Sequence, residues 1–227
     1  VAAGNNGTAD GPSTLYPPAN DPFVITVGAS EDIGTASLTD DTMAIFSAYG
    51  LTDDGFAKPD LVAPGRNVIA PLAAKASTVY TAHPLHRVGD YYFRMSGTSM
   101  SAPVVSGAVA LLLQDEPNLT PDQVKYRLMN TANIGWQGYI SPGPDPANPG
   151  YLDVYAAVNG TSTQSANTGI TVSNMLTTGS DPVTWGSVGW NSVGWNSVGW
   201  NSVGWNSVGW NSVGWNSVGW NTSTWDD

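Results

Sequence analysis

The chain of 227 residues contains no cysteine, so neither disulfide bonds nor thiolate metal sites contribute to its fold. Lysine and arginine are scarce: 7 cations stand against 18 acidic residues, for a net charge of −11. Because nucleic-acid binding depends on cations that neutralise phosphates, this balance argues against a nucleic-acid partner. No apolar run is long enough to span a bilayer, so no transmembrane helix is expected.

The residues that are present fall into three zones of different composition. Residues 1–159 are mixed, and with 41% hydrophobic residues overall the chain can bury a core. Residues 160–182 are rich in Ser, Thr, Asn and Gly, which predicts a linker with one strand at 169–173. Residues 183–225 form a repeat without a charged residue. We therefore expect a globular domain (1–159), a linker (160–182) and a repeat tail (183–227).

Short apolar runs in the first zone predict strands. The run at 23–29 is typical of a buried strand, and two further β-like runs at 60–63 and 67–70 flank Pro64-Gly65. Two helices are also indicated. Residues 101–113 are apolar on almost all sides, which predicts a buried helix. Strands that alternate with buried helices indicate an α/β domain.

The second helix is predicted from its start signal. Thr120 supplies a capping hydroxyl, Pro121 suits the first helical position, and Gln123 completes a capping box. We expect this helix to end near Thr131.

The stretch from Gly97 to Pro103 is the strongest candidate for chemistry, because it places Ser99 where an irregular segment enters the first helix. Free N–H groups and the positive end of the helix dipole lie beside such a serine. Both would stabilise an oxyanion that forms next to its hydroxyl. For this motif alone, the alternative is an ordinary helix cap.

The stretch resembles the nucleophile motif of the subtilisin-like serine proteases, and five further blocks resemble signature segments of that family in the family's order. These blocks are Ala2–Asn5, Tyr16–Ala19 with Val24–Ala29, Phe46–Gly50, Lys58–Gly65, and the closing segments Gln123–Lys125 and Gly150–Val154. The resemblance covers residues 1 to about 159. It implies an α/β fold with a doubly wound, mostly parallel sheet, whose N-terminal half is absent from this chain. A β-rich repeat tail would follow.

The resemblance implies a role for each matching residue. Ser99 resembles the nucleophile, and Asn5 resembles the side-chain donor to the oxyanion, with the Ser99 N–H as the second donor. Thr98 would lie beside this oxyanion hole. The pocket for the residue before the scissile bond would be apolar and of medium depth, with Leu15 at its floor and Asn6 and Gly7 on its wall.

The residues that would complete a catalytic triad are missing from the expected positions. In the family the order is Asp, His, Asn, Ser, so the Asp and His are expected upstream of Val1. His83 and His86 lie in a segment that resembles an inserted surface loop; we expect them to be solvated, and as a metal pair they lack a third ligand. We therefore expect this chain alone to be inactive and to need the missing half or a partner chain to fold, with further residues preceding Val1.

Calcium is the one cofactor that the resemblance favours, as a structural ion. Hard cations bind carboxylates, and the alternative is that the acidic residues are solvated and serve solubility. No ligands are assigned. The candidate acids are Asp21, Glu31, Asp32, Asp40, Asp41, Asp53 and Asp54.

The tail repeats the pentapeptide GWNSV, with a tryptophan at every fifth residue from Trp185 to Trp225. A period of five matches neither a helix nor a one-sided strand. A chain that turns once per repeat would stack like residues into a β-solenoid with Trp, Asn and Val ladders. Nine units would make only about two coils, so the tail should dock on its own domain, a second copy or a ligand. The alternatives are a disordered tail or a sorting signal.

Three functions remain open from the sequence. The first is a serine endopeptidase, secreted or at the cell surface, that acts on proteins or peptides. The second is a structural protein on a protease-like scaffold that self-assembles through residues 183–225. The third is a carbohydrate-binding strip in the tail, since exposed tryptophans stack on sugar rings.

Overall fold

The computed structural model describes residues 1–8, 11–72, 77–136 and 149–170. The chain divides into the units Val1–Thr171 and Val172–Asp227, and only the first contains described residues. The predicted solenoid therefore lies outside the described residues, as does most of the strand expected at 169–173, of which Gly169 lies in a turn. In the described part of the chain, no helix has the length and apolar character needed to cross a membrane.

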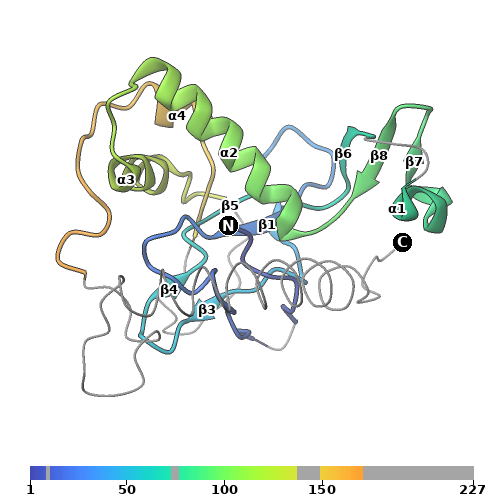
Figure 1. The fold of residues 1–227 in the computed structure, drawn as a ribbon, viewed down its shortest axis with the longest axis horizontal. Coiled ribbons are helices and arrows are strands. Elements are labelled where there is room, and N and C mark those ends of the chain that lie inside the picture. Colours follow the sequence, from blue (N-terminus) through green and yellow to red (C-terminus); the bar gives the residue numbers. More distant parts are fainter. Residues whose placement is uncertain (9–10, 73–76, 137–148, 171–227) are drawn as a thin grey trace, which may run out of the picture. The chain divides into compact units, whose positions relative to one another are not determined.

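The central sheet has the strand order β2-β1-β5-β9 (Figure 1). Its strands are β1 (Val27–Glu31), β2 (Thr42–Met43), β5 (Leu61–Pro64) and β9 (Gly150–Tyr151). β1, β5 and β9 are parallel, whereas β2 is antiparallel to β1. The sheet is therefore mixed, within the α/β class that the sequence predicts. Next to β2, Ala2 pairs in parallel with Val27, so the first residues of the chain lie along β1.

The strand β1 begins later than the apolar run predicts, at Val27 instead of Phe23. The backbone just before it is bonded to side chains. Thr26 N donates to Asp60 Oδ2 at 2.7 Å, and the Val24 carbonyl accepts from Lys58 Nζ and Lys125 Nζ at 3.2 and 2.8 Å. These groups cannot join a strand ladder at the same time, so the prediction of a strand over 23–26 was wrong.

The helix α2 (Thr98–Asp115) packs across β1 and β5, with α4 (Val154–Val158) beside its C-terminal half (Figure 1). Their contact forms the main core, and each fully buried aliphatic side chain contributes about 1.5–3 kcal/mol. The core residues are Val27, Leu61, Ala63, Val105, Ala108, Leu112, Val124, Leu128, Leu152 and Ala157.

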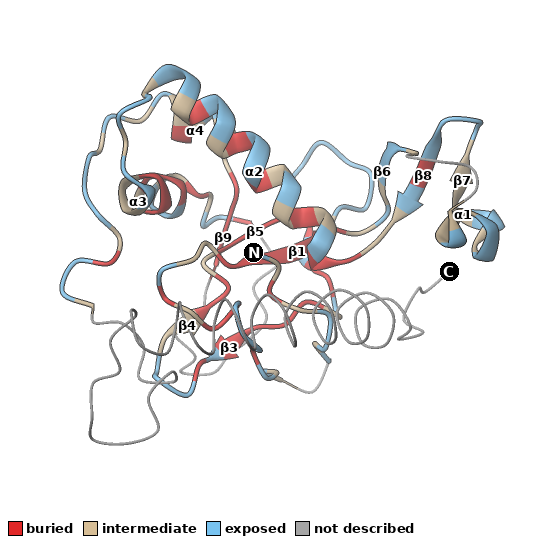
Figure 2. Cartoon of the chain, in the orientation of Figure 1, coloured by how far each residue is buried: buried red, intermediate tan, exposed pale blue. Residues whose placement is uncertain are grey.

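The expected burial of this helix holds for one side, and its other face is exposed, as expected for a chain without the N-terminal half of the domain. Only the side of α2 that faces the sheet is buried, and the opposite side is exposed (Figure 2). Leu111 is 52% exposed, and Pro103 and Gly107 are exposed on the same side. The described elements that pack most closely on α2 are β1, β5 and α4, and Leu111 lies at the hollow beside α4. The uncovered face of α2 is therefore mostly apolar from Pro103 to Leu111, with Ser106 also exposed, and becomes polar at Gln114 and Asp115.

The helix α3 (Pro121–Thr131) matches its prediction. Thr120 Oγ1 accepts from Gln123 N at 3.3 Å and Gln123 Oε1 accepts from Thr120 N at 2.8 Å, so the capping box is formed. The first part of the predicted linker lies against this helix: Asn167 Nδ2 donates to Asp122 Oδ1 at 2.6 Å, and Arg127 Nε donates to the Ser162 carbonyl at 2.8 Å. Residues 160–170 are thus fixed to the domain.

A smaller hairpin of β3 (Gly50–Leu51) and β4 (Ala57–Lys58) lies beside a second core. In this core Trp136 meets Tyr151 edge to face, with ring centroids 5.4 Å apart, and donates Nε1 to the Pro149 carbonyl at 3.1 Å. Met43, Tyr49 and Val62 complete the cluster.

Residues 67–72 and 77–95 form a folded arm that precedes α2 (Figure 1). Its sheet has the order β6-β8-β7 and is antiparallel. The elements are β6 (Val68–Pro71), α1 (Thr78–Ala82), the 3-10 turn η1 (Pro84–His86), β7 (Arg87–Val88) and β8 (Tyr92–Met95). The segment expected to be a solvated loop is therefore folded, because the aromatic run at 91–93 supplies a strand and a buried Phe93.

Candidate active site

Gly97 sets the geometry at the start of α2. Its φ of 148° lies in the range that favours glycine, and a Cβ there would lie 3.1 Å from Asn5 Nδ2. Gly97 N donates to the Gly65 carbonyl at 2.8 Å, and its own carbonyl accepts from Met100 N at 2.9 Å. The turn therefore brings the helix N-terminus against Asn5.

Asn5 and Thr98 are joined by two hydrogen bonds, although 93 positions separate them. Asn5 Oδ1 accepts from both Thr98 N and Thr98 Oγ1, each at 2.9 Å. Thr98 Oγ1 in turn accepts from Gly4 N at 3.1 Å. Because the amide oxygen of Asn5 is occupied by these donors, the side chain has a fixed orientation and its Nδ2 donor is left for other acceptors.

Ser99 is exposed and is the second residue of α2. Its backbone N–H lies in the first turn and has no acceptor within the helix. Within the described residues no hydrogen bond engages its hydroxyl. An exposed serine hydroxyl, a backbone N–H group and, through Thr98, the Asn5 side chain thus lie at the positive end of an 18-residue helix.

The predicted pocket residues Asn6, Gly7 and Leu15 follow Asn5 in the chain, and one hydrogen bond links their two segments. Asn6 Nδ2 donates to the Thr14 carbonyl at 2.8 Å, which links the segment after Asn5 to the residue before Leu15. Leu15 is buried with Ala3 and Ala48. At Gly7 a Cβ would lie 2.4 Å from the Ser47 carbonyl oxygen, so only glycine fits there.

His83 and His86 lie in the arm and contact other residues of the arm. His86 Nδ1 lies 3.1 Å from the Arg94 carbonyl, and its ring stacks on Phe93 at 5.9 Å. His83 meets His86 edge to face at 5.7 Å. Within the described part of the chain no contact joins either histidine to Ser99.

The described acids do not fit a metal cage. Among the described residues no three His, Cys, Asp or Glu side chains are placed so that they could together hold a metal ion. Glu31 pairs with Arg66 at 3.0 Å, and Asp40 accepts from the Thr35 hydroxyl at 2.9 Å. Burial raises the pKa of Asp41, and nearby Asp32 and Asp40 raise it further. No step below uses a metal.

A buried ionic cluster that the sequence did not predict lies at the segment before β1. Asp60 binds Lys58 at 2.8 Å and Lys125 at 2.9 Å, and all three side chains are at most 5% exposed. Burial lowers the pKa of Lys58 to about 8, against the opposing effect of Asp60. The cluster holds the segment that leads into β1, and the N-terminal amine donates to the Ile25 carbonyl there at 2.6 Å. Lys58 and Asp60 are two residues apart, but Lys125 comes from the distant helix α3, so no short motif predicts the complete cluster.

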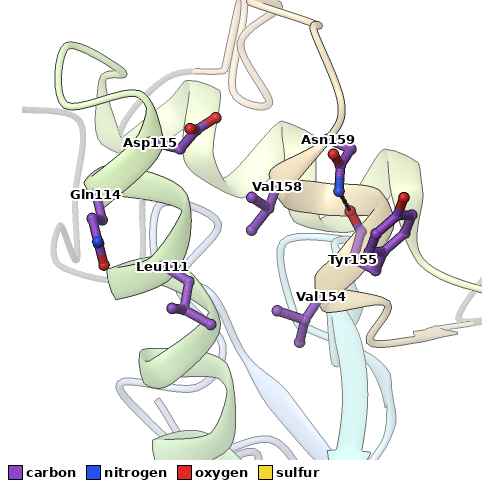
Figure 3. Close-up of a pocket in the computed structure, with 7 residues that line it drawn as sticks. All are labelled: Leu111, Gln114, Asp115, Val154, Tyr155, Val158 and Asn159. Atoms are coloured by element: carbon purple, nitrogen blue, oxygen red, sulfur yellow. Dashed lines mark hydrogen bonds between the residues drawn. The ribbon is translucent and has the colours of Figure 1, made fainter.

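A separate hollow lies between α2 and α4, where Leu111 faces Val154 and Val158 (Figure 3). Its lining is mostly apolar and holds no nucleophile with a base. It lies on the C-terminal half of α2, whereas Ser99 is at the other end. This hollow is therefore not the candidate active site.

Comparison with known proteins agrees with this geometry. A family model described as "Subtilase family" matches residues 1–171. The chain is 48% identical over 130 residues to "Serine protease AprX" of Bacillus subtilis (strain 168), which covers 57% of this chain and 29% of the relative. It is 34% identical over 144 residues to "Subtilisin DY" of Bacillus licheniformis, which covers 63% of this chain and 42% of the relative. The chain thus spans less than half the length of these relatives.

A solved structure gives the same result for the fold. The crystal structure of fervidolysin from Fervidobacterium pennivorans, described as a keratinolytic enzyme related to subtilisin, aligns with a TM-score of 0.53. It is 34% identical, and the alignment covers 71% of this chain and 22% of that one. Together with the match of the family model to most of the chain, this shows that the chain belongs to the subtilase family.

Proposed function

We propose that this chain carries the nucleophile and the oxyanion-binding groups of a serine endopeptidase that cleaves proteins or peptides. The observation that carries the proposal is the pair of hydrogen bonds from Thr98 to Asn5 Oδ1 beside Ser99. They fix an amide donor at a helix N-terminus next to an exposed serine hydroxyl. An ordinary helix cap needs only one of these bonds and no second donor beside it.

In the proposed reaction, Ser99 Oγ attacks the carbonyl carbon of the scissile bond while its proton passes to a base. Negative charge then develops on the carbonyl oxygen. Asn5 Nδ2 and the Ser99 N–H donate hydrogen bonds to that oxygen, and the helix dipole adds to their effect. When the intermediate collapses, the amine leaves with a proton and the acyl group stays on Ser99, from which water releases it.

The base and its orienting carboxylate are the parts that this chain does not supply at the site. We place both upstream of Val1, in the order that the family resemblance implies. His83 and His86 are occupied in the arm. The chain by itself is accordingly expected to be inactive, with the missing half of the domain or a partner chain as its complement.

The proposal extends to the substrate pocket and to the location of the protein. Leu15, Asn6 and Gly7 would form an apolar pocket of medium depth for the residue before the scissile bond. Without cysteines the protein tolerates an oxidising environment, and we place it outside the cell or on its surface. A structural calcium ion, if bound, would need ligands beyond the described acids.

Labelling with a fluorophosphonate probe tests the proposal in the full-length protein. The expected result is a phosphonylated Ser99 in the peptide map, lost in the Ser99→Ala variant. Asn5→Ala should lower kcat by about 10²–10³, a magnitude carried over from a subtilisin. Intact Ser99 after exposure of the full-length protein to the probe would sink the proposal.

The repeat tail lies outside the described residues, and its roles remain proposals. Self-assembly through residues 183–225 is tested by sedimentation of the protein with and without residues 183–227. Equal particle sizes would contradict assembly. Carbohydrate binding by the tail is tested with insoluble glycans, and failure to bind them would remove that function.

A further inference from the structure

The arm before α2 has two faces, because side chains alternate along its strands. In the register of the sheet, Phe93 lies opposite Ala70 and Arg87, whereas Arg94 lies opposite Ile69. Phe93 therefore belongs to one face, which we call the inner face. Arg94 and Tyr92 alternate with Phe93 along β8, and Ile69 pairs with Arg94. These three side chains therefore lie on the other face, which we call the outer face.

The inner face of the arm is covered. Phe93 is 5% exposed, and its ring lies 6.4 Å from Tyr80 and 5.9 Å from His86, centroid to centroid. The Arg87 guanidinium lies 4.0 Å from the centre of the Tyr80 ring and also donates to the Tyr80 carbonyl. This face has its own small core and is closed to a ligand.

The outer face is open. Ile69 is 54% exposed and Tyr92 is 49% exposed, and Arg94, which pairs with Ile69 and follows Tyr92 by two residues on β8, is exposed as well. Within the described residues no helix or strand packs on this face (Figure 2). An aliphatic, an aromatic and a cationic side chain thus stand together on one surface.

Arg94 differs from every other described cation. Lys75 lies outside the described residues, and five of the remaining six Lys and Arg have a carboxylate or carbonyl partner. Those five pairs are Lys58 and Lys125 with Asp60, Arg66 with Glu31, Arg127 with Glu116, and Arg87 with Tyr80. In the described part of the chain the Arg94 guanidinium has no such partner. Among the described residues of this acidic chain, Arg94 is thus the cation available to an external anion.

The position of Arg94 ties it to the candidate nucleophile. It lies on β8, five residues before Ser99, and Ser96 and Gly97 are anchored to Asn67 and Gly65 on the way. An extended chain covers at most about 3.6 Å per residue, so the two Cα atoms are at most about 18 Å apart. An extended substrate bound at Ser99 would reach Arg94 within about five residues of the scissile bond.

We propose that Arg94 binds an Asp or Glu side chain of the polypeptide substrate, up to about five residues from the scissile bond, and that Ile69 and Tyr92 contact the side chains next to it. This specificity rests on the proposed endopeptidase function. A carboxylate fits because the guanidinium presents parallel N–H donors that match it. The flanking apolar surface lowers the exposure of the ion pair to water and salt.

The test uses the full-length protein and quenched peptides in pairs. Each pair carries Asp or its neutral isostere Asn at one of five positions on either side of the scissile bond, in an otherwise constant sequence. We expect one position at which the Asp peptide has the higher kcat/KM, by about two- to fivefold, mainly through KM. Arg94→Gln should bring this ratio to one, Arg94→Glu should invert it, and Arg94→Lys should retain part of it.

Arg66→Gln is the matched control, since Arg66 is engaged by Glu31 and should leave the ratio unchanged. Far-UV circular dichroism and the Tm check that each variant is folded. Cleavage with a ratio of one at all ten positions, or a preference that persists in Arg94→Gln, overturns the role of Arg94 and leaves the endopeptidase proposal standing. Absence of any cleavage together with absence of Ser99 labelling overturns both.

Discussion

At the scale of single residues, the candidate site depends on the hydrogen bonds between Asn5 and Thr98 as well as on Ser99. Asn5 Oδ1 accepts two hydrogen bonds from Thr98, and Thr98 Oγ1 accepts one from Gly4 N. The threonine thus orients the Asn5 amide, and in the proposed reaction it is a positioning residue. Each such bond contributes about 0.5–1.5 kcal/mol, so the amide cannot rotate away at little cost.

Lys58 gives the chain a pH dependence of stability. Burial lowers its folded-state pKa to about 8 from 10.5, so between these values the unfolded chain holds more protons than the folded one. The contribution of Lys58 to the free energy of unfolding is therefore lost as the pH falls through 8 and is fully present above 10.5. Over that window it amounts to at most about 3 kcal/mol.

The prediction is that Lys58→Met flattens the rise in the free energy of unfolding between pH 8 and 10.5. Urea denaturation of the full-length protein at several pH values measures it, on a Ser99→Ala background that prevents self-digestion. Comparing the two proteins cancels the other groups that titrate in this range. Parallel curves for the variant and its parent would contradict the role of Lys58.

At the scale of elements, the sequence predicts the ends of helices and strands that are set by contacts between residues close together in the chain. The capping box at Thr120 places the start of α3 correctly, because its bonds join residues three apart. β1 was misplaced at Phe23, since bonds to Asp60 and the two lysines come from distant parts of the chain. For the same reason the sequence suggests Asn5 and Ser99 only through a resemblance, whereas their contact through Thr98 needs the fold.

The start of α2 is the element on which the site depends, and Gly97→Ala tests it. Alanine disfavours a φ of 148°, and its Cβ would lie 3.1 Å from Asn5 Nδ2. We expect a loss of about 1–3 kcal/mol in stability and a slower reaction of Ser99 with the fluorophosphonate probe. Timed labelling of the full-length protein and urea denaturation measure the two effects.

Gly55 offers a matched control in the turn between β3 and β4. Its φ is 82°, but a Cβ there meets no atom within 4 Å. Gly55→Ala should therefore cost stability through the backbone alone and leave the labelling rate of Ser99 unchanged. If Gly97→Ala labels as fast as Gly55→Ala, the turn does not position the oxyanion-binding groups.

At the scale of the whole molecule, the uncovered face of α2 is at odds with an ordinary surface helix. Such helices carry charged residues along the solvent side, whereas here Pro103, Gly107 and Leu111 are exposed and a charged residue, Asp115, comes only at the end of the helix. The relatives are more than twice as long as the matched part of this chain. We therefore expect the missing half of the domain to cover this face in the full-length protein.

Leu111→Glu tests that expectation. A carboxylate at a covered apolar face would be buried without a partner, so the variant should lose at least about 2 kcal/mol in the full-length protein. Leu85→Glu makes the same chemical change on the arm, where the leucine is 78% exposed, and should change stability by less than about 0.5 kcal/mol. Urea denaturation of both variants decides the matter. If Leu111→Glu and Leu85→Glu have equal free energies of unfolding, the outer side of α2 is exposed to water in the full-length protein. The missing half of the domain would then pack against a different face.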